Sequence, residues 1–418
     1  MDHSSAIALL RTLRNQEFSL FISARFILIS ALFIQSTALS YQMYQLTGNP
    51  LSLGLIGLSE LIPALGLSVF AGYLADQLEK RTLFLGCVLA YVACAGITYW
   101  IISPNFIEQF GQKACEWSMY GSMFMNGMIR AFIAPASFSL LPMLIPRQEI
   151  PRAITWSSTA WLLGSVIGPL VSGLIIAYVN SSNAILWAMI LFVLTAFLTS
   201  RIQKKPFERK KDDTVLKGIS EGFRFIFKNK IILAVLSLDL FAVLFGGAET
   251  LLPVFSKEIL NCGPTGFGWL RSAHGLGSVF LLFVLAYLPL KTNVGNKLLF
   301  SVAGFGLCII LFGLSRNFYF SFLCLFVAGL FDGVSVVIRH SILQLKTPED
   351  IKGRVSSVNM MFISSSNELG AFESGLAARL LGTVPSVVFG GIMTVVIAIL
   401  TFVGIPALRK VRLEAIKE

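Results

Sequence analysis

Ionisable side chains inside long apolar runs are the residues of this chain with the clearest capacity for chemistry. A charged side chain near the middle of a lipid bilayer costs at least about 2.5 kcal/mol, so each one needs a partner or a function. A carboxylate in a low-dielectric cavity can take up a proton, and it releases that proton when an arginine comes near. The residues concerned are Arg25, Glu60, Arg130, Asp239, Glu249, Arg271, His274, Asp332, Arg339, His340, Glu368, Glu373 and Arg379.

Asp239 and Asp332 are the leading candidates for proton carriers within this set. Glu368 and Glu373 lie five residues apart in one apolar run, so they point to different helix faces and are not expected to share a proton. For any single charge, the alternative is a static pair that fixes helix packing. The further candidates for proton coupling or for lining a polar cavity are Arg25, Arg130, Glu368, Glu373, Glu249 and His274.

Uncharged polar residues in the same runs supply candidate substrate contacts, namely Gln35, Gln42, Asn126 and Asn359. Other chemistries find no support in the sequence. An ATP-driven pump would carry the phosphate-binding pattern G-x-x-x-x-G-K-S/T, which this chain lacks. Its three histidines are far apart and its six cysteines show no metal-ligand spacing. We therefore expect no enzyme activity, no metal site and no cofactor.

The elements that position these residues follow from composition. The chain is 55% hydrophobic and only 13% charged, with a mean hydropathy of +0.77. A soluble domain has about 25% charged residues, so the solvent around this chain is expected to be lipid. A helix needs about 20 apolar residues to cross a bilayer. Twelve such spans are predicted near 18–44, 51–75, 82–103, 118–144, 154–179, 183–201, 229–256, 265–289, 297–314, 318–346, 355–382 and 385–408.

Basic residues are distributed unequally over the loops between these spans. One alternating set of loops, which includes both termini, holds about 25 lysines and arginines, whereas the other holds only Lys113, Lys257 and Arg316. Lysine and arginine concentrate on the cytoplasmic side of membrane proteins, so we expect both termini in the cytoplasm. The net charge of +11 is then a consequence of topology and does not indicate a nucleic-acid partner.

The chain also repeats itself. A shift of 214 residues places Gly54 on Gly268, and a shift of 202 residues places Gly173 on Gly375. The repeat sets Arg25 against Asp239, Gln35 against Glu249, Glu60 against His274 and Arg130 against Asp332. Such groups could form ion pairs across a cavity between the halves or bind a charged substrate. We predict an all-α membrane protein of two six-helix halves, 1–201 and 229–418, joined by a cytoplasmic linker at 202–228, with substrate bound between the halves.

The loop after the second span reads GYLADQLEKR from Gly72 to Arg81. A helix end with an aspartate, followed by a basic turn, can form a latch of paired charges. This stretch resembles the loop signature of the major facilitator superfamily, except that Glu79 stands where that signature has a glycine. The resemblance implies a gating role for this loop, with Gly72, Asp76, Lys80 and Arg81 as its site residues.

Small residues recur along the fifth span at Gly164, Gly168 and Gly173, with Pro169 among them. Such spacing lets helices approach closely, and the proline bends the helix. The pattern is similar to the helix-five antiporter signature of exporters in the same superfamily. Ordinary helix packing is the alternative explanation.

Four further segments, residues 239–248, 252–255, 354–356 and 366–375, resemble the enterobactin-exporter-like branch of this superfamily. The resemblance covers nearly the whole chain. It implies a twelve-helix fold in a bacterial inner membrane and proton-coupled export of a siderophore or another small lipophilic compound by a monomer. Proton-coupled import is the main alternative, because it uses the same fold and similar charges. A non-transporting membrane sensor or assembly protein is less well supported, because it would be expected to lose the cavity charges.

Overall fold

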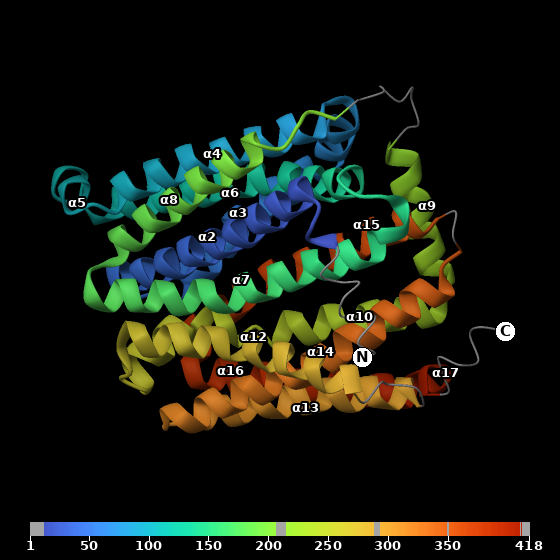
Figure 1. Ribbon diagram of the computed structural model, residues 1–418. Helices are drawn as coiled ribbons and strands as arrows, with labels where there is room; N and C mark the ends of the chain where they lie inside the picture. Colours follow the sequence, from blue (N-terminus) through green and yellow to red (C-terminus); the bar gives the residue numbers. More distant parts are fainter. Residues whose placement is uncertain (1–11, 206–214, 288–292, 349–350, 410, 412–418) are drawn as a thin grey trace. The chain divides into compact units, whose positions relative to one another are not determined.

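The computed structural model describes residues 12–205, 215–287, 293–348, 351–409 and 411, and in these residues all regular structure is helical (Figure 1). The main helices are α2 (Gln16–Thr47), α3 (Pro50–Gln77), α4 (Lys80–Ile101), α6 (Gln112–Leu140), α7 (Ile150–Tyr178), α8 (Ser181–Ser200), α9 (Val215–Lys228), α10 (Lys230–Phe245), α12 (Gly263–Tyr287), α13 (Val294–Leu314), α14 (Phe318–Lys346), α15 (Lys352–Leu381) and α16 (Thr383–Gly404). Short helices are α5 (Pro104–Phe110), α11 (Leu252–Val254) and α17 (Pro406–Arg409).

Within the described residues, 11 helical segments are long and apolar enough to cross a membrane. They correspond to the predicted spans except for the eleventh, which is helix α15. That helix has 30 residues, enough to cross, but serines, glutamates and arginines make it less apolar than the others. The expectation of an all-α membrane protein is confirmed.

The predicted seventh span, 229–256, differs from the structure because it is not one continuous helix. Helix α10 ends at Phe245, and a 3-10 turn at Ala248–Leu251, α11 and a π turn at Phe255–Ile259 follow it. The interruption falls at two consecutive glycines. A Cβ atom on Gly246 would lie 2.6 Å from the carbonyl oxygen of Ala242, so a larger residue does not fit this bend.

The chain folds into two compact units. Unit 1 comprises Met1–Gly48, Ser59–Asp212 and Gly263–Ser272, and unit 2 comprises Asn49–Leu58, Asp213–Cys262 and Ala273–Glu418. Helices α3 and α12 each give their first turns to one unit and their remainder to the other. Each unit therefore contains a short helical piece from the other half of the sequence.

In unit 1 this piece is the start of α12, which packs against α7. A Cβ atom on Gly173 would lie 2.7 Å from the carbonyl oxygen of Pro264 and 2.9 Å from the Cα atom of Gly268. Two helix backbones can approach this closely only where neither carries a side chain.

Unit 2 contains the equivalent contact between the start of α3 and α15. A Cβ atom on Gly375 would lie 2.9 Å from the carbonyl oxygen of Pro50 and 3.0 Å from the Cα atom of Gly54. The shift of 214 residues that aligns Gly54 with Gly268 also aligns Pro50 with Pro264. The same three backbone positions thus form both contacts, which is what a duplicated helix pair would produce.

Helix α9, in the second part of the predicted linker, packs against unit 2. Ile226 is fully buried in an apolar cluster that includes Val355 and Val358 of α15. On the same contact, the Arg354 guanidinium forms an ion pair with Glu221. The chain that leads into α10 is therefore fixed to α15 by both apolar and ionic contacts.

The substitution Gly375→Ala tests the close backbone contact in unit 2. The added methyl would meet backbone atoms of α3 that cannot rotate away, and we expect a loss of about 1–3 kcal/mol in stability. The measurement is the thermal unfolding midpoint of the purified protein in detergent. Gly353→Ala in the same helix is the control, because its Cβ would have no neighbour within 4 Å. Equal midpoints for the two variants would contradict the proposed contact.

Candidate functional site

A buried ion pair joins two helices of unit 2. Asp239 on α10 pairs with the Arg339 guanidinium on α14, and their side chains are only 9% and 11% exposed. Removing one partner from such a pair leaves an unpaired buried charge, which costs about 3–5 kcal/mol. Arg339 therefore keeps Asp239 compatible with a membrane-spanning helix.

A second group in unit 2 consists of an imidazole between two carboxylates. Nδ1 of His274 on α12 lies 3.4 Å from a carboxylate oxygen of Glu249. Nε2 of the same ring lies 3.7 Å from a carboxylate oxygen of Asp332 on α14. We name Glu249, His274 and Asp332 the acid–imidazole group. Both ring nitrogens face an acceptor, so this imidazole can carry a proton between the two acids.

A small cavity connects the acid–imidazole group with the ion pair. Asp332 and Asp239 both line it, together with the hydroxyl-bearing residues Ser301 and Ser335. Its volume of about 10 Å³ is close to what one water molecule needs. Unit 2 thus brings together four of the predicted coupling residues, Asp239, Glu249, His274 and Asp332.

Unit 1 contains mainly basic polar groups. A carboxylate oxygen of Glu60 on α3 accepts a hydrogen bond from Arg130 on α6 at 2.7 Å. Arg25 on α2 donates to the hydroxyl of Ser137 and, at 3.5 Å, to the carbonyl oxygen of Ser157. Its partners in the described residues are uncharged, so no carboxylate neutralises the Arg25 guanidinium there.

The ion pairs differ from those suggested by the sequence repeat. Arg130 and Asp239 were set against residues of the opposite half, but each has a partner on a neighbouring helix of its own unit. Those partners, Glu60 and Arg339, are ionisable residues of the apolar runs that the sequence does not single out as site residues. Opposite charge was the only available signal, because no short sequence spacing links either pair.

Two predicted substrate contacts have buried polar atoms without partners. Neither amide atom of Gln35 has a hydrogen-bond partner among the residues that the structure describes, and the residue is 3% exposed. Asn126 donates to the carbonyl oxygen of Ser122 at 3.1 Å, but its own Oδ1 has no partner. Asn359 is buried in unit 2, and Gln42 is partly exposed in unit 1. Gln35 and Asn126 therefore retain hydrogen-bonding capacity.

The two glutamates of α15 differ in their surroundings. A Cβ atom on Gly57 of α3 would lie 3.0 Å from a carboxylate oxygen of Glu368, so this side chain faces the first turns of α3. Glu373 is partly buried farther along α15. The spacing of five residues predicts different faces, and the structure gives no contact that joins the two carboxylates among the described residues.

The glycines of the helix-five motif lie at close contacts between helices. A Cβ atom on Gly164 would lie 2.7 Å from the Ile29 side chain, and one on Gly168 would lie 2.6 Å from Phe33. Both neighbours belong to α2. Pro169 lies inside α7, and the last glycine of the motif contacts α12 as described above. The motif thus lets α7 approach two helices of unit 1.

The predicted gating loop is fixed to two other segments of unit 1. Arg81 donates to the carbonyl oxygens of Thr199 and Ser200, at 3.4 and 2.6 Å, where α8 ends. A cation is favourable there, because the carbonyls at a helix C-terminus carry partial negative charge. Gly72 and Lys80 lie at the ends of α3 and α4, whereas the side chain of Asp76 is outside the described part of the structure.

Glu79, which replaces the usual glycine, is the N-cap of α4. Its carboxylate accepts hydrogen bonds from the backbone N–H groups of Arg81 and Thr82 and from the Thr82 hydroxyl. It also accepts one from the backbone N–H of Lys205 at 3.4 Å. Partial burial raises the pKa of the Glu79 carboxyl, but these hydrogen bonds outweigh burial and hold the pKa below its usual value.

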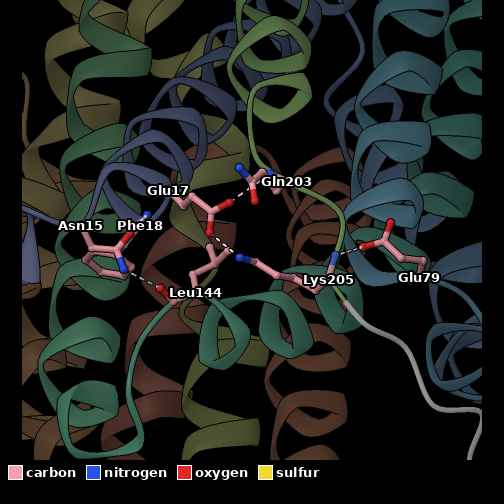
Figure 2. Close-up of polar contacts among 7 residues, drawn as sticks. All are labelled: Asn15, Glu17, Phe18, Glu79, Leu144, Gln203 and Lys205. Atoms are coloured by element: carbon pink, nitrogen blue, oxygen red, sulfur yellow. Dashed lines mark hydrogen bonds and ion pairs between the residues drawn. The ribbon is translucent and has the colours of Figure 1, made fainter.

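Lys205 extends this network to the start of α2 (Figure 2). Its ammonium group pairs with the carboxylate of Glu17, which also accepts a hydrogen bond from the backbone N–H of Gln203 at 3.0 Å. The segment after α8 is therefore held between α2 and the loop that precedes α4. No local pattern of the sequence links Glu17, Glu79 and Lys205, because the three residues are far apart in the chain.

Substitution of the buried ion pair tests its structural contribution. Asp239→Asn and Arg339→Gln should each lower stability by about 3–5 kcal/mol, because each leaves one buried charge unpaired. The double variant should recover a large part of this loss. The measurement is thermal unfolding in detergent. Additive losses in the double variant would show that the two side chains do not depend on each other.

Glu79→Ala tests the cap of α4 and should cost about 1 kcal/mol at neutral pH. Because the folded-state pKa of this carboxyl is depressed, its stabilisation is complete above the unfolded pKa and is lost as pH falls through the folded value. The difference in unfolding midpoint between wild type and variant should therefore shrink in acid. The exposed Glu108→Ala is the control. A difference that grows in acid would contradict the assignment.

Comparisons with known proteins agree with this architecture. A profile of the Major Facilitator Superfamily matches residues 21–371. The enterobactin exporter EntS of Escherichia coli O1:K1 is 24% identical over 411 residues, covering 97% of this chain and 95% of EntS. The uncharacterized MFS-type transporter YfiS of Bacillus subtilis strain 168 is 23% identical over 394 residues, covering 88% of this chain and 87% of YfiS.

Among solved structures, the nucleoside transporter NupG has a TM-score of 0.70 at 16% sequence identity. The match covers 95% of this chain and 100% of NupG, and at this identity it shows the fold alone. The profile match extends over most of the chain and agrees with the helical architecture. The protein is therefore a multi-pass membrane transporter that belongs to the Major Facilitator Superfamily.

Proposed function

We propose that this protein is a proton-coupled exporter of a siderophore or another small amphiphilic compound, working by alternating access. The observation that carries the proposal is the acid–imidazole group of unit 2 beside the buried ion pair. A transporter that couples to protons needs ionisable side chains within the membrane, and this cluster has three of them.

Charge balance indicates how the group exchanges a proton. With His274 protonated and both Glu249 and Asp332 ionised, the group carries one net negative charge. One more proton would bring the net charge of the group to zero. A low-dielectric site disfavours net charge and therefore favours uptake of this proton. Access of water on one side and then on the other would let this proton enter and leave. Arg339 leaves Asp239 out of this exchange, because it stabilises the ionised aspartate.

Exposure varies along this set of residues. The Glu249 side chain is 54% exposed, those of His274 and Asp332 are 25% and 29% exposed, and that of Asp239 is 9% exposed. The small cavity between Asp332 and Asp239 could hold a water molecule that links them. We infer that protons reach Asp332 through Glu249 and His274.

Unit 1 supplies groups suited to the substrate. The Arg25 guanidinium has only uncharged partners in the described residues, so it is available to attract a negative group of a ligand. Gln35 and Asn126 offer unpaired amide atoms for hydrogen bonds. Such a combination of charge and hydrogen-bonding groups within apolar helices suits an amphiphilic compound. Enterobactin, which the name of the relative EntS mentions, supports siderophores as the first class to test.

The name of the relative EntS favours export over import. The direction of substrate transport can be measured in one experiment. Everted vesicles contain the protein with its cytoplasmic face outward, and a pH-sensitive dye reports lumenal protons. An exporter that exchanges substrate for protons releases protons from the lumen when a siderophore or lipophilic drug is added outside. A symporter moves protons in the same direction as its substrate, so it produces the opposite signal.

Asp332→Asn tests the coupling role. We expect substrate-induced proton release to fall to the level of vesicles without the protein, because the variant cannot complete the proton exchange. Substrate counterflow, which requires no net proton movement, should persist and shows that the variant is folded. Glu108→Gln, an exposed carboxylate in α5, is the control and should behave as wild type. Unchanged proton release by Asp332→Asn would disprove the assignment.

A further inference from the structure

Hydrogen bonds join helices α4 and α6 of unit 1 near the end of α4. There the thiol of Cys115 lies 3.3 Å from the carbonyl oxygen of Ile101, and the thiol of Cys94 lies 3.5 Å from the carbonyl oxygen of Ser122. Toward the first turn of α4 no such contact joins the two helices among the described residues. A groove of about 610 Å³ opens between them instead, which is the size of a ligand pocket.

The groove is mainly apolar and extends along the membrane-spanning part of α4. From Thr82 to Ala90 the helix rises about 12 Å, close to the depth of one leaflet of a hydrocarbon core about 30 Å thick. Its lining suits a hydrocarbon chain and offers little to water. The apolar side chains that form it include Leu83, Ala90, Met128, Ile129 and Phe132.

One flank of the groove is open. A Cβ atom on Gly86 would have no neighbour within 4 Å, and Met128 on the opposite wall is 41% exposed. Phe132 is held edge-on against Phe70 of α3, with 6.4 Å between ring centroids, which closes another side. Exposed side chains of a membrane-spanning segment face hydrocarbon unless protein covers them. The groove is therefore accessible to the acyl chains of the bilayer.

A basic segment, residues 201–205, begins near the groove, because the backbone N–H of Lys205 donates at 3.4 Å to Glu79, which lines it. Arg81 is bonded to backbone carbonyls and Arg201 lies 4.8 Å above the Phe197 ring, so in these contacts no carboxylate neutralises either charge. Lys204 is exposed in the next segment. The carboxylate of Glu79 at the same place is occupied by its hydrogen bonds to N–H groups. Positive charge at a membrane surface attracts anionic lipid headgroups.

We propose that this groove is a binding site for one anionic phospholipid, with an acyl chain along α4 and α6 and the headgroup near Arg201 and Lys204. The apolar lining and the leaflet-length extent identify the occupant of the groove as an acyl chain, and the basic rim specifies an anionic headgroup. The site is separate from the acid–imidazole group, which lies in unit 2. The lipid proposal therefore does not depend on the proposed transport function.

The test uses the full-length protein in nanodiscs with a trace of phosphatidylglycerol that carries a photoreactive diazirine in one acyl chain. After illumination, mass spectrometry of the digested protein locates the crosslinks. We expect them in residues 82–90 and 128–132. Unlabelled phosphatidylglycerol should compete about thirtyfold better than phosphatidylethanolamine, because Arg201 and Lys204 each contribute about 1 kcal/mol to the binding of an anionic lipid.

Gly86→Phe fills the groove and should abolish these crosslinks. Gly121→Phe is the matched control, because a Cβ atom at either glycine has open space around it and Gly121 is not among the residues lining the groove. Size-exclusion profiles confirm that both variants are folded. Arg201→Gln combined with Lys204→Gln should remove the preference for phosphatidylglycerol while crosslinking persists. Lys113→Gln should leave that preference unchanged.

Three results would overturn the proposal. Crosslinks spread evenly over the apolar surface, or unaffected by Gly86→Phe, would show that the groove holds no lipid of its own. Equal competition by phosphatidylethanolamine would remove the anionic specificity. Competition by siderophores or lipophilic drugs, with none by phosphatidylglycerol, would identify the groove as a substrate site.

Discussion

The cost of charge in hydrocarbon is the constraint on which this structure depends. Each ionised group within a membrane-spanning helix must meet a partner nearby, because neither water nor counterions can neutralise it there. Asp239 meets Arg339 and Glu60 meets Arg130, in each case from another helix of the same unit. These pairs therefore define which helices lie together, and the groups that remain without full compensation are the ones available for function.

That division separates the two units chemically. Unit 2 contains the acid–imidazole group, which can gain or lose a proton, and unit 1 contains Arg25, whose positive charge has only uncharged partners in the described residues. In the proposed mechanism the acid–imidazole group exchanges protons and Arg25 attracts the substrate. These two proposed roles fall to different halves of the sequence.

Backbone contacts at glycines complement these ionic contacts. The α7–α12 and α3–α15 contacts use equivalent positions of the repeat, so duplication preserved the packing where it no longer preserved the charges. Steric requirements explain this difference. A close backbone crossing tolerates only glycine at its centre, whereas a charge can be replaced whenever a neighbouring helix supplies a new partner.

The sequence alone determined that the chain is an all-α membrane protein with a repeat. The observations that show this are its apolar runs, its basic loops and the glycines that align between its halves. They can be read from the sequence because a bilayer requires long, continuous apolar helices. Only the tertiary structure decided that Asp239 pairs with Arg339, that the seventh span breaks after Phe245, and that Glu79 caps α4. Lys205 reaches Glu17 over 188 positions of sequence. Such contacts depend on how helices are rotated and spaced, and no local period of the sequence encodes that geometry.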